Sequence, residues 1–161
     1  MFINPKQAIE EGWLRGVPEE HIQPNAVDIS VNSIFSLDDF STFELYKDGK
    51  HHRQRTEVTL NLDKQWFLPW KGAYDFTSSS YVVMPKGVVG WLVTRSTLNR
   101  NGVFVLSGLY DSGFKGHICG VLYNHSGKIV MDPESRVAQF IMATSDSAGV
   151  YAGGYNVEEG K

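Results

Sequence analysis

The strongest constraint on the fold is a succession of short strand-like segments, most of them followed within a few residues by a turn signal. Residues 27–35 alternate apolar and polar side chains, as a half-buried strand does. Further strands are expected at 58–62, 81–84, 88–94, 103–106, 117–123 and 136–143. Turn-forming pairs occur between segments, among them Asp48-Gly49, Asn101-Gly102, Ser126-Gly127 and Asp132-Pro133. Many short strands at this spacing are typical of a sandwich, jelly roll or barrel, so the sequence predicts an all-β fold.

A short helix is expected ahead of the strands, at residues 4–15. Asn4 can cap its first turn, and Pro5 suits the first helical position because an N–H there would be unpaired anyway. Gly16 and Pro18 follow as stop signals. The chain therefore combines one N-terminal helix with a β-rich remainder.

Composition narrows the class of protein. The 161 residues correspond most simply to one domain, and 42% hydrophobic with 20% charged residues argues against wholesale disorder. The formal net charge of −3 argues against a protein that coats nucleic acid, so no nucleic-acid partner is expected. Cys119 is the only cysteine, which excludes an intramolecular disulfide. Because the N-terminus is polar and no apolar stretch approaches the roughly 20 residues of a membrane span, we expect a cytoplasmic protein without membrane contact.

Two polar regions stand apart from the strand pattern. Residues 1–147 are expected to form a single β domain, and residues 148–161, rich in glycine and acid, a mobile C-terminal segment. The sequence Tyr151-Ala-Gly-Gly-Tyr155 adds aromatic side chains and glycine hinges, which an active-site lid would need. Residues 47–57 predict a solvated loop, because the adjacent His51 and His52 would point to opposite faces of an extended chain.

Residues 95–100 (RSTLNR) have the chemistry of a phosphate-binding turn. Ser96 and Thr97 offer hydroxyl donors, and Arg95 and Arg100 supply positive charge. Hydrogen bonds to charged groups are the stronger ones, worth about 1.5–3 kcal/mol each. The alternative is a surface turn with two solvated arginines.

Three further side chains are candidates for a site. Asp111 is a single carboxylate in a Gly-flanked apolar segment, suited to water activation or sugar recognition, or else to a turn held by its own backbone. Phe114 offers a flat ring, with simple core packing as the alternative. Gln139 lies in an apolar strand and needs a partner, either a core hydrogen bond or a phosphate.

Four segments in order resemble the motifs of the dUTPase/dCTP deaminase superfamily. They are residues 22–29 (IQPNAVDI), 95–100 (RSTLNR), 108–124 (GLYDSGFKGHICGVLYN) and 136–141 (RVAQFI). The first segment and the preceding helix are similar to the dCTP deaminase branch. The resemblance implies a distorted jelly roll or β-barrel of the dUTPase-like β-clip type, with a short N-terminal helix. Asp28, in the first segment, is expected to be a structural partner of an arginine.

The resemblance also implies roles for the candidate residues. Asp111 would orient the water that attacks the α-phosphate, and Phe114 would pack under the deoxyribose and leave no room for a ribose 2′-hydroxyl. The phosphates would be bound by Arg95, Ser96, Thr97, Arg100 and Gln139. The sugar and base would be contacted by Ser107, Gly108, Phe114 and Tyr155. Mg²⁺ would bind through the triphosphate, with no direct protein ligand, and the active sites would lie between the subunits of a homotrimer.

The residue type at position 121 distinguishes the two activities known in the superfamily, and here it is Val121. The dCTP deaminases carry a glutamate at this position, and amine hydrolysis needs such a group to shuttle protons. Here the segment reads Gly120-Val121-Leu122-Tyr123-Asn124. No Cys/His set for a zinc deaminase is present either. The sequence therefore predicts a dUTP diphosphatase that releases dUMP and diphosphate.

Three alternatives stay open. The overall layout of the chain favours a dCTP deaminase or a bifunctional deaminase–diphosphatase, whereas Val121 opposes it. The hairpin between Arg100 and Asp111 is slightly shorter than usual, and no Ser or Thr follows Tyr155 to hold a γ-phosphate. Those departures allow a catalytically weak nucleotide-binding regulator, or a diphosphatase for another pyrimidine deoxynucleotide.

Overall fold

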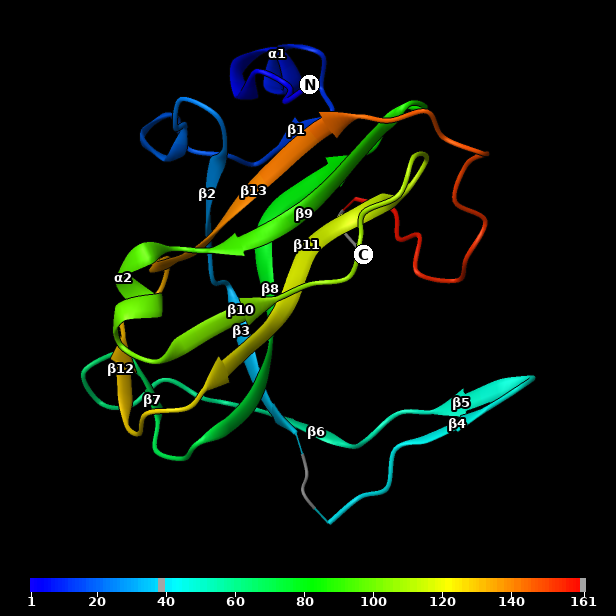
Figure 1. Ribbon diagram of the computed structural model, residues 1–161. Coiled ribbons are helices and arrows are strands. Elements are labelled where there is room, and N and C mark those ends of the chain that lie inside the picture. Colours follow the sequence, from blue (N-terminus) through cyan, green and yellow to red (C-terminus); the bar gives the residue numbers. More distant parts are fainter. Residues whose placement is uncertain (38–39, 160–161) are drawn as a thin grey trace.

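The computed structural model describes residues 1–37 and 40–159, and its elements are almost all strands (Figure 1). In chain order they are α1 (Pro5–Glu10), β1 (Leu14–Arg15), the 3₁₀ turn η1 (Glu19–His21), β2 (Val27–Ser30), β3 (Ser33–Leu37), β4 (Glu44–Tyr46), β5 (Gly49–His51), β6 (Arg55–Glu57), β7 (Trp66–Leu68), β8 (Gly72–Val83), β9 (Val88–Thr94), α2 (Ser96–Arg100), β10 (Val103–Leu106), β11 (Lys115–Asn124), β12 (Ile129–Met131) and β13 (Arg136–Thr144). The expectation of an all-β fold with a short N-terminal helix is confirmed.

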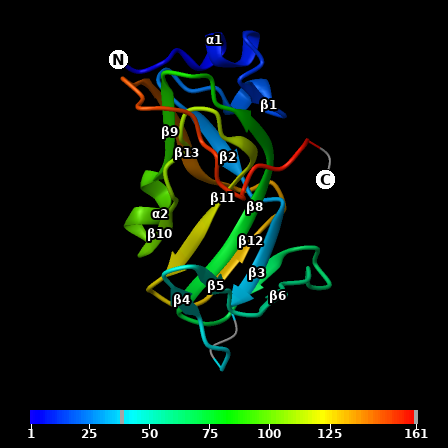
Figure 2. The ribbon, with the colours of Figure 1, turned by 90° about the vertical axis from the view of Figure 1, so that its right-hand side faces the viewer.

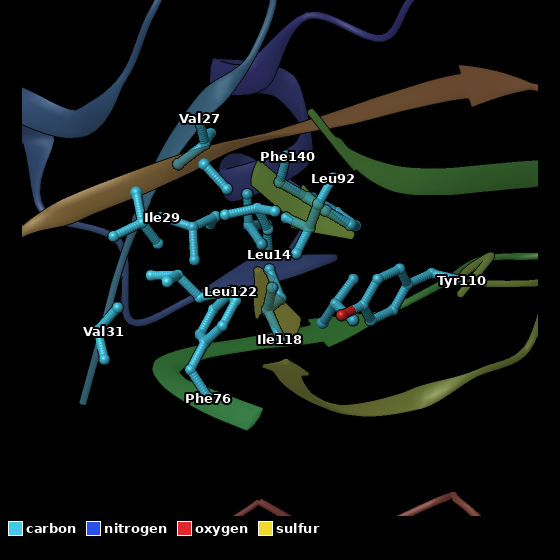
Figure 3. Packing of buried hydrophobic residues seen from close by; sticks show 14 of the residues in the cluster. Leu14, Val27, Ile29, Val31, Phe76, Leu92, Tyr110, Ile118, Leu122 and Phe140 are labelled. Atoms are coloured by element: carbon cyan, nitrogen blue, oxygen red, sulfur yellow. The ribbon is translucent and has the colours of Figure 1, made fainter. Parts of the chain in front are cut away.

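Two antiparallel sheets enclose the core. The larger sheet has the order β10-β11-β8-β3-β6, with β1 also paired to β8, and the smaller has the order β2-β13-β9. Side chains from both sheets meet between them, including Ile29 of β2, Phe140 of β13, and Phe76 and Leu122 of the larger sheet (Figure 3). Each is 2% exposed or less, so the two sheets share one hydrophobic core.

The N-terminal helix ends earlier than predicted. Asn4 does cap it, since its side chain accepts a hydrogen bond from the Lys6 N–H. Gly12 then adopts a φ of +69°, and the Trp13 N–H bonds the Ala8 carbonyl at 2.9 Å, which closes the helix in a Schellman-type turn. The prediction of a helix through residue 15 is therefore wrong in its last part, because glycine stops the helix before the next apolar residues.

Two strand predictions fail for identifiable reasons. Residues 27–35 form two strands in different sheets, because the chain crosses the core at 31–32. At Val31 the backbone bonds Ser135, and at Asn32 it bonds Thr77 of the other sheet. No strand forms at 58–62. There the side chain of Asn61 accepts from two backbone N–H groups further along the chain and holds a turn instead.

The predicted strand at 81–84 is only the end of β8, which pairs with β11, β3 and β1. The strands predicted at 88–94, 103–106, 117–123 and 136–143 correspond to β9, β10, β11 and β13.

The hairpin β4–β5 projects away from the body in Figure 1, and in Figure 2, where that side faces the viewer, it lies in front of the lower part of the molecule. The C-terminal residues run along the opposite side of the larger sheet from α2 (Figure 1). Within the described part of the chain, no helix is long and apolar enough to cross a bilayer.

Candidate functional site

A buried carboxylate organises the first, second and fourth motifs. Asp28 of β2 is 2% exposed. Its Oδ2 lies 3.1 Å from Arg136 Nη1 and 3.5 Å from Arg95 Nε, and its Oδ1 accepts from Gln139 Nε2 at 3.2 Å. A buried charge is stable only when paired and hydrogen-bonded, and the two arginines with the Gln139 amide meet that need. Asp28 is thus the structural partner of two arginines.

The RSTLNR segment is a short helix and not the turn that was predicted. Arg95 occupies the position before α2 and donates from Nη1 to the Arg136 carbonyl at 3.0 Å. The side chains of Ser96, Thr97 and Arg100 are exposed. Two arginines thus flank the single Asp28 carboxylate beside the solvent-facing hydroxyls of Ser96 and Thr97. That arrangement suits a phosphate-bearing ligand.

Gln139 has both a structural partner and an open side. Its amide donates to Asp28, which is the core hydrogen bond that the sequence left open. It also borders a surface hollow of about 270 Å³. The other lining residues are Phe2, Gln23, Pro24, Asn25, Ala26 and Ile141. The amide is therefore fixed in orientation while still facing a space at the surface.

The Asp111 turn presents its carboxylate to solvent. The backbone carbonyl of Asp111 accepts from the Phe114 N–H at 3.0 Å, but no hydrogen bond of its carboxylate to any described residue occurs. Ser112, buried beneath, anchors the turn by donating to the Val88 carbonyl at 2.9 Å. Gly113 adopts a φ of +85°, which L-residues rarely allow. The turn is thus held by its neighbours, and the Asp111 side chain remains available.

Three aromatic rings pack edge to face beside this turn. Phe114 lies 5.3 Å from Tyr110 and 5.5 Å from Tyr151, centroid to centroid. The Tyr110 hydroxyl donates to the Cys119 carbonyl at 2.6 Å and accepts from the Cys119 N–H at 2.9 Å. Burial raises the pKa of Tyr110 far above its usual value. Phe114 is therefore held in place on one side by a protonated, hydrogen-bonded tyrosine.

The hairpin β10–β11 opens towards the Asp111 turn. Its last paired residues are Leu106 and Val121, so the chain from Ser107 onwards leaves the strand ladder. Ser107 Oγ accepts a hydrogen bond from the Leu92 N–H at 3.0 Å, which holds the chain where it leaves β10. Gly108 is exposed, and a Cβ built on it would meet no atom within 4 Å. The opening therefore leaves room for a ligand at the backbone.

Across β11 from this opening lies a carboxylate that sequence reasoning missed. Asp75 of β8 is the register partner of Val121, and its Oδ2 lies 2.5 Å from Arg55 Nη1. Burial is the main cause that raises the pKa of the nearby Cys119 thiol, and the negative charge of Asp75 is the second. Only strand register brings these residues together, and no local motif in the sequence signals it.

The C-terminal segment packs on its own chain. The Tyr151 N–H donates to the Ser112 carbonyl at 2.6 Å, and the Val157 N–H donates to the Lys115 carbonyl at 3.0 Å. Tyr155 contacts β5, where the Lys50 ammonium lies 4.0 Å from the centroid of its ring. In this arrangement Tyr151, and not Tyr155, covers Phe114.

The Asp111 turn and the Asp28 cluster lie apart within one chain. Tyr110 pairs with Gly90 in β9, whereas Arg95 follows the end of the same strand. Five residues of strand separate the two positions by roughly 17 Å. A single chain thus brings Asp111 near Phe114, but not near Ser96, Thr97 or Arg100.

The described residues contain no group of three or more His, Cys, Asp or Glu side chains placed to hold a metal ion. An Mg²⁺ ion that keeps several waters and binds mainly to substrate phosphates does not need such a group.

Comparison with known proteins gives the family. Residues 5–145 match the family model described as dCTP deaminase-like. The chain is 30% identical over 146 residues to the "Probable deoxyuridine 5′-triphosphate nucleotidohydrolase" of Halobacterium salinarum, covering 88% of this chain and 87% of that protein. It is 34% identical over 158 residues to the dCTP deaminase of Pyrobaculum islandicum, covering 96% of this chain and 89% of that protein.

A solved structure shares the fold. The 2′-deoxycytidine 5′-triphosphate deaminase of Agrobacterium tumefaciens superimposes with a TM-score of 0.69 at 12% identity over 89% of this chain. The match covers 48% of the deaminase chain, so this protein spans about half its length. With the family model matching most of its length, the chain belongs to the dCTP deaminase-like family, within the superfamily of dUTPases and dCTP deaminases.

Proposed function

We propose that this protein is a dUTP diphosphatase, which hydrolyses dUTP to dUMP and diphosphate. The observation that carries the proposal is the exposed Asp111 carboxylate, held beside Phe114 by a turn that does not use the carboxylate itself. Val121 supports it further, because an apolar side chain stands where the deaminases of the superfamily carry a glutamate.

In this proposal Asp111 accepts a hydrogen bond from a water molecule and orients it towards the α-phosphate. Phe114 packs against the deoxyribose, and Tyr110 holds the ring in place. Ser96, Thr97 and Arg100 bind the phosphate oxygens, and positioning with charge neutralisation lowers the barrier. Mg²⁺, bound through the triphosphate, would add further neutralisation of the phosphate charge.

The site would be shared between copies of the chain. Roughly 17 Å of β9 separate the Asp111 turn from the RSTLNR helix in one chain, and one nucleotide must contact both. A neighbouring subunit that contributes its own Ser96 would close this gap, and the homotrimer that the superfamily resemblance implies would supply such a neighbour. Light scattering that finds a fully active monomer would contradict the shared site.

A dCTP deaminase or bifunctional enzyme is the second candidate, and Asp75 is the observation in its favour. Its carboxylate stands on the strand next to Val121. Its ion pair with Arg55 counts against a proton shuttle, because the carboxylate is already held by the guanidinium at 2.5 Å.

The experiment is a product assay with Mg²⁺ and a panel of deoxynucleotides, comparing the parent with Asp111→Asn. The parent should release dUMP and diphosphate from dUTP and should not convert dCTP to dUTP. The variant should lose about 10²–10⁴-fold in kcat. Asp63→Asn, the same change at an exposed turn, is the control and should keep the parent rate. Appreciable deamination of dCTP would overturn the proposal in favour of the second candidate.

A further inference from the structure

One row of residues crosses the outer face of the larger sheet beside the hairpin opening. Strand register places Leu106 opposite Val121, Val121 opposite Asp75, and Asp75 opposite Phe35. Their neighbours along each strand point the other way and are buried in the core. Those neighbours are Val105, Leu122, Phe76 and Ile34. The row therefore faces outward, and two strand spacings, about 10 Å, separate Leu106 from Asp75.

The charged end of this row is rigid. Arg55 Nη1 lies 2.5 Å from Asp75 Oδ2, and the Arg55 guanidinium lies 4.3 Å from the centroid of the Phe35 ring. The ring and the carboxylate together fix the plane of the guanidinium. The side chains of Arg55 and Asp75 remain 52% and 27% exposed, so both can still reach a ligand.

The other end of the row is apolar and open. Leu106 is 60% exposed, and Val121 beside it is half-buried. Apolar surface bordered by a few fixed polar groups is the usual composition of a small-molecule site. Ser107, where the hairpin opens, follows Leu106 directly in the chain.

We infer that the Arg55–Asp75 pair reads the edge of the pyrimidine base and selects a 4-oxo over a 4-amino pyrimidine. The inference rests on the proposed function. Uracil presents O4 as an acceptor and N3–H as a donor, whereas cytosine presents an amino donor and N3 as an acceptor. The free N–H groups of Arg55 match O4, and the Asp75 carboxylate matches N3–H. Cytosine would set its amino group against the guanidinium and its N3 against the carboxylate.

The discrimination should be substantial but bounded. A good bidentate pair contributes about 5- to 150-fold discrimination against the wrong base. Because both side chains are partly exposed, we expect about tenfold. Asp75→Asn keeps the shape and adds a donor, so it should reduce the preference for uracil to near unity.

The test measures dissociation constants of non-hydrolysable dUTP and dCTP analogues with Mg²⁺ by calorimetry, so it does not depend on turnover. A second variant, Arg55→Asp with Asp75→Arg, keeps an ion pair but exchanges the donor and acceptor positions. It should lower the dUTP:dCTP affinity ratio at least tenfold. Glu57→Gln is the matched control: this exposed residue lies on the same strand as Arg55, and its variant should keep the parent ratio.

Thermal melting and light scattering monitor the folding and assembly of each variant, so that the possible outcomes can be distinguished. Folded variants with an unchanged affinity ratio overturn the inference and leave the diphosphatase proposal intact. Equal loss of both analogues together with dissociation of the oligomer also overturns it, because the pair would then be a subunit contact. A parent protein that binds neither analogue overturns the proposed function itself.

Discussion

Asp28→Asn should destabilise the protein by about 3 kcal/mol, although no substrate contact is assigned to this residue. The carboxylate pairs with Arg136 and Arg95 at 3.1 and 3.5 Å, and it accepts a hydrogen bond from the Gln139 amide at 3.2 Å. The amide would keep one oxygen for Gln139 but would turn an N–H towards the arginines.

The magnitude follows from burial. Removing one partner of a buried ion pair costs about 3–5 kcal/mol, because the remaining charge is left unpaired. Asp28 itself is fully enclosed, but the side chains of Arg95 and Arg136 are 27% and 37% exposed. Water can therefore solvate them in part, which places the loss near the low end, about 3 kcal/mol. For a chain of this length such a loss lowers Tm by roughly 6–12 °C.

Urea unfolding at fixed protein concentration measures this loss, since an oligomer's stability depends on concentration. The control is Asp132→Asn, whose carboxylate also accepts from a glutamine amide, Gln65 at 2.9 Å, but is exposed and pairs with no arginine. It should change the free energy of unfolding by less than about 0.5 kcal/mol. A loss below about 1 kcal/mol for Asp28→Asn would refute the reasoning.

Three further predictions concern the region around Asp111. Tyr110→Phe should cost about 1–3 kcal/mol at neutral pH, because it leaves the Cys119 backbone without its partner. Above pH 10 the folded state keeps the Tyr110 proton, whereas the unfolded state releases it. The free energy of unfolding of the parent should therefore fall by up to about 1.4 kcal/mol per pH unit above pH 10. Denaturant titrations from pH 9 to 11 should show that Tyr110→Phe lacks this pH-dependent loss. Burial, and then the charge of Asp75, raises the pKa of the Cys119 thiol, so this thiol should react slowly with iodoacetamide at pH 7.5. The reaction should be faster in Asp75→Asn, because that variant lacks the negative charge that disfavours the thiolate. Equal rates would contradict the predicted contribution of Asp75. A chain truncated after Ser147 should fold and assemble but lose most dUTP turnover, because the cover over Phe114 is gone; full activity would exclude a lid.

Local rules determined the elements whose signals lie within a few residues. Asn4 and Pro5 start α1 because a cap and a first-turn proline act on the backbone directly beside them. The alternation at 88–94 and 136–143 gave β9 and β13, because a strand with one face in the core repeats its pattern every two residues. The motif spacing also indicated the superfamily, which the family match confirms.

The contacts that shape the candidate site come from tertiary structure. The superfamily resemblance predicted an arginine partner for Asp28, but nothing near Asp28 in the sequence indicates that Arg95 and Arg136, far along the chain, would both pair with it. Nothing near Val121 indicates that Asp75 would stand opposite, because register depends on how whole strands align across a sheet. The split at 31–32 has the same origin: the alternating pattern is continuous, but each half pairs with a different sheet. Sequence therefore indicated which residues are candidates for the site, and long-range pairing decided which of them meet.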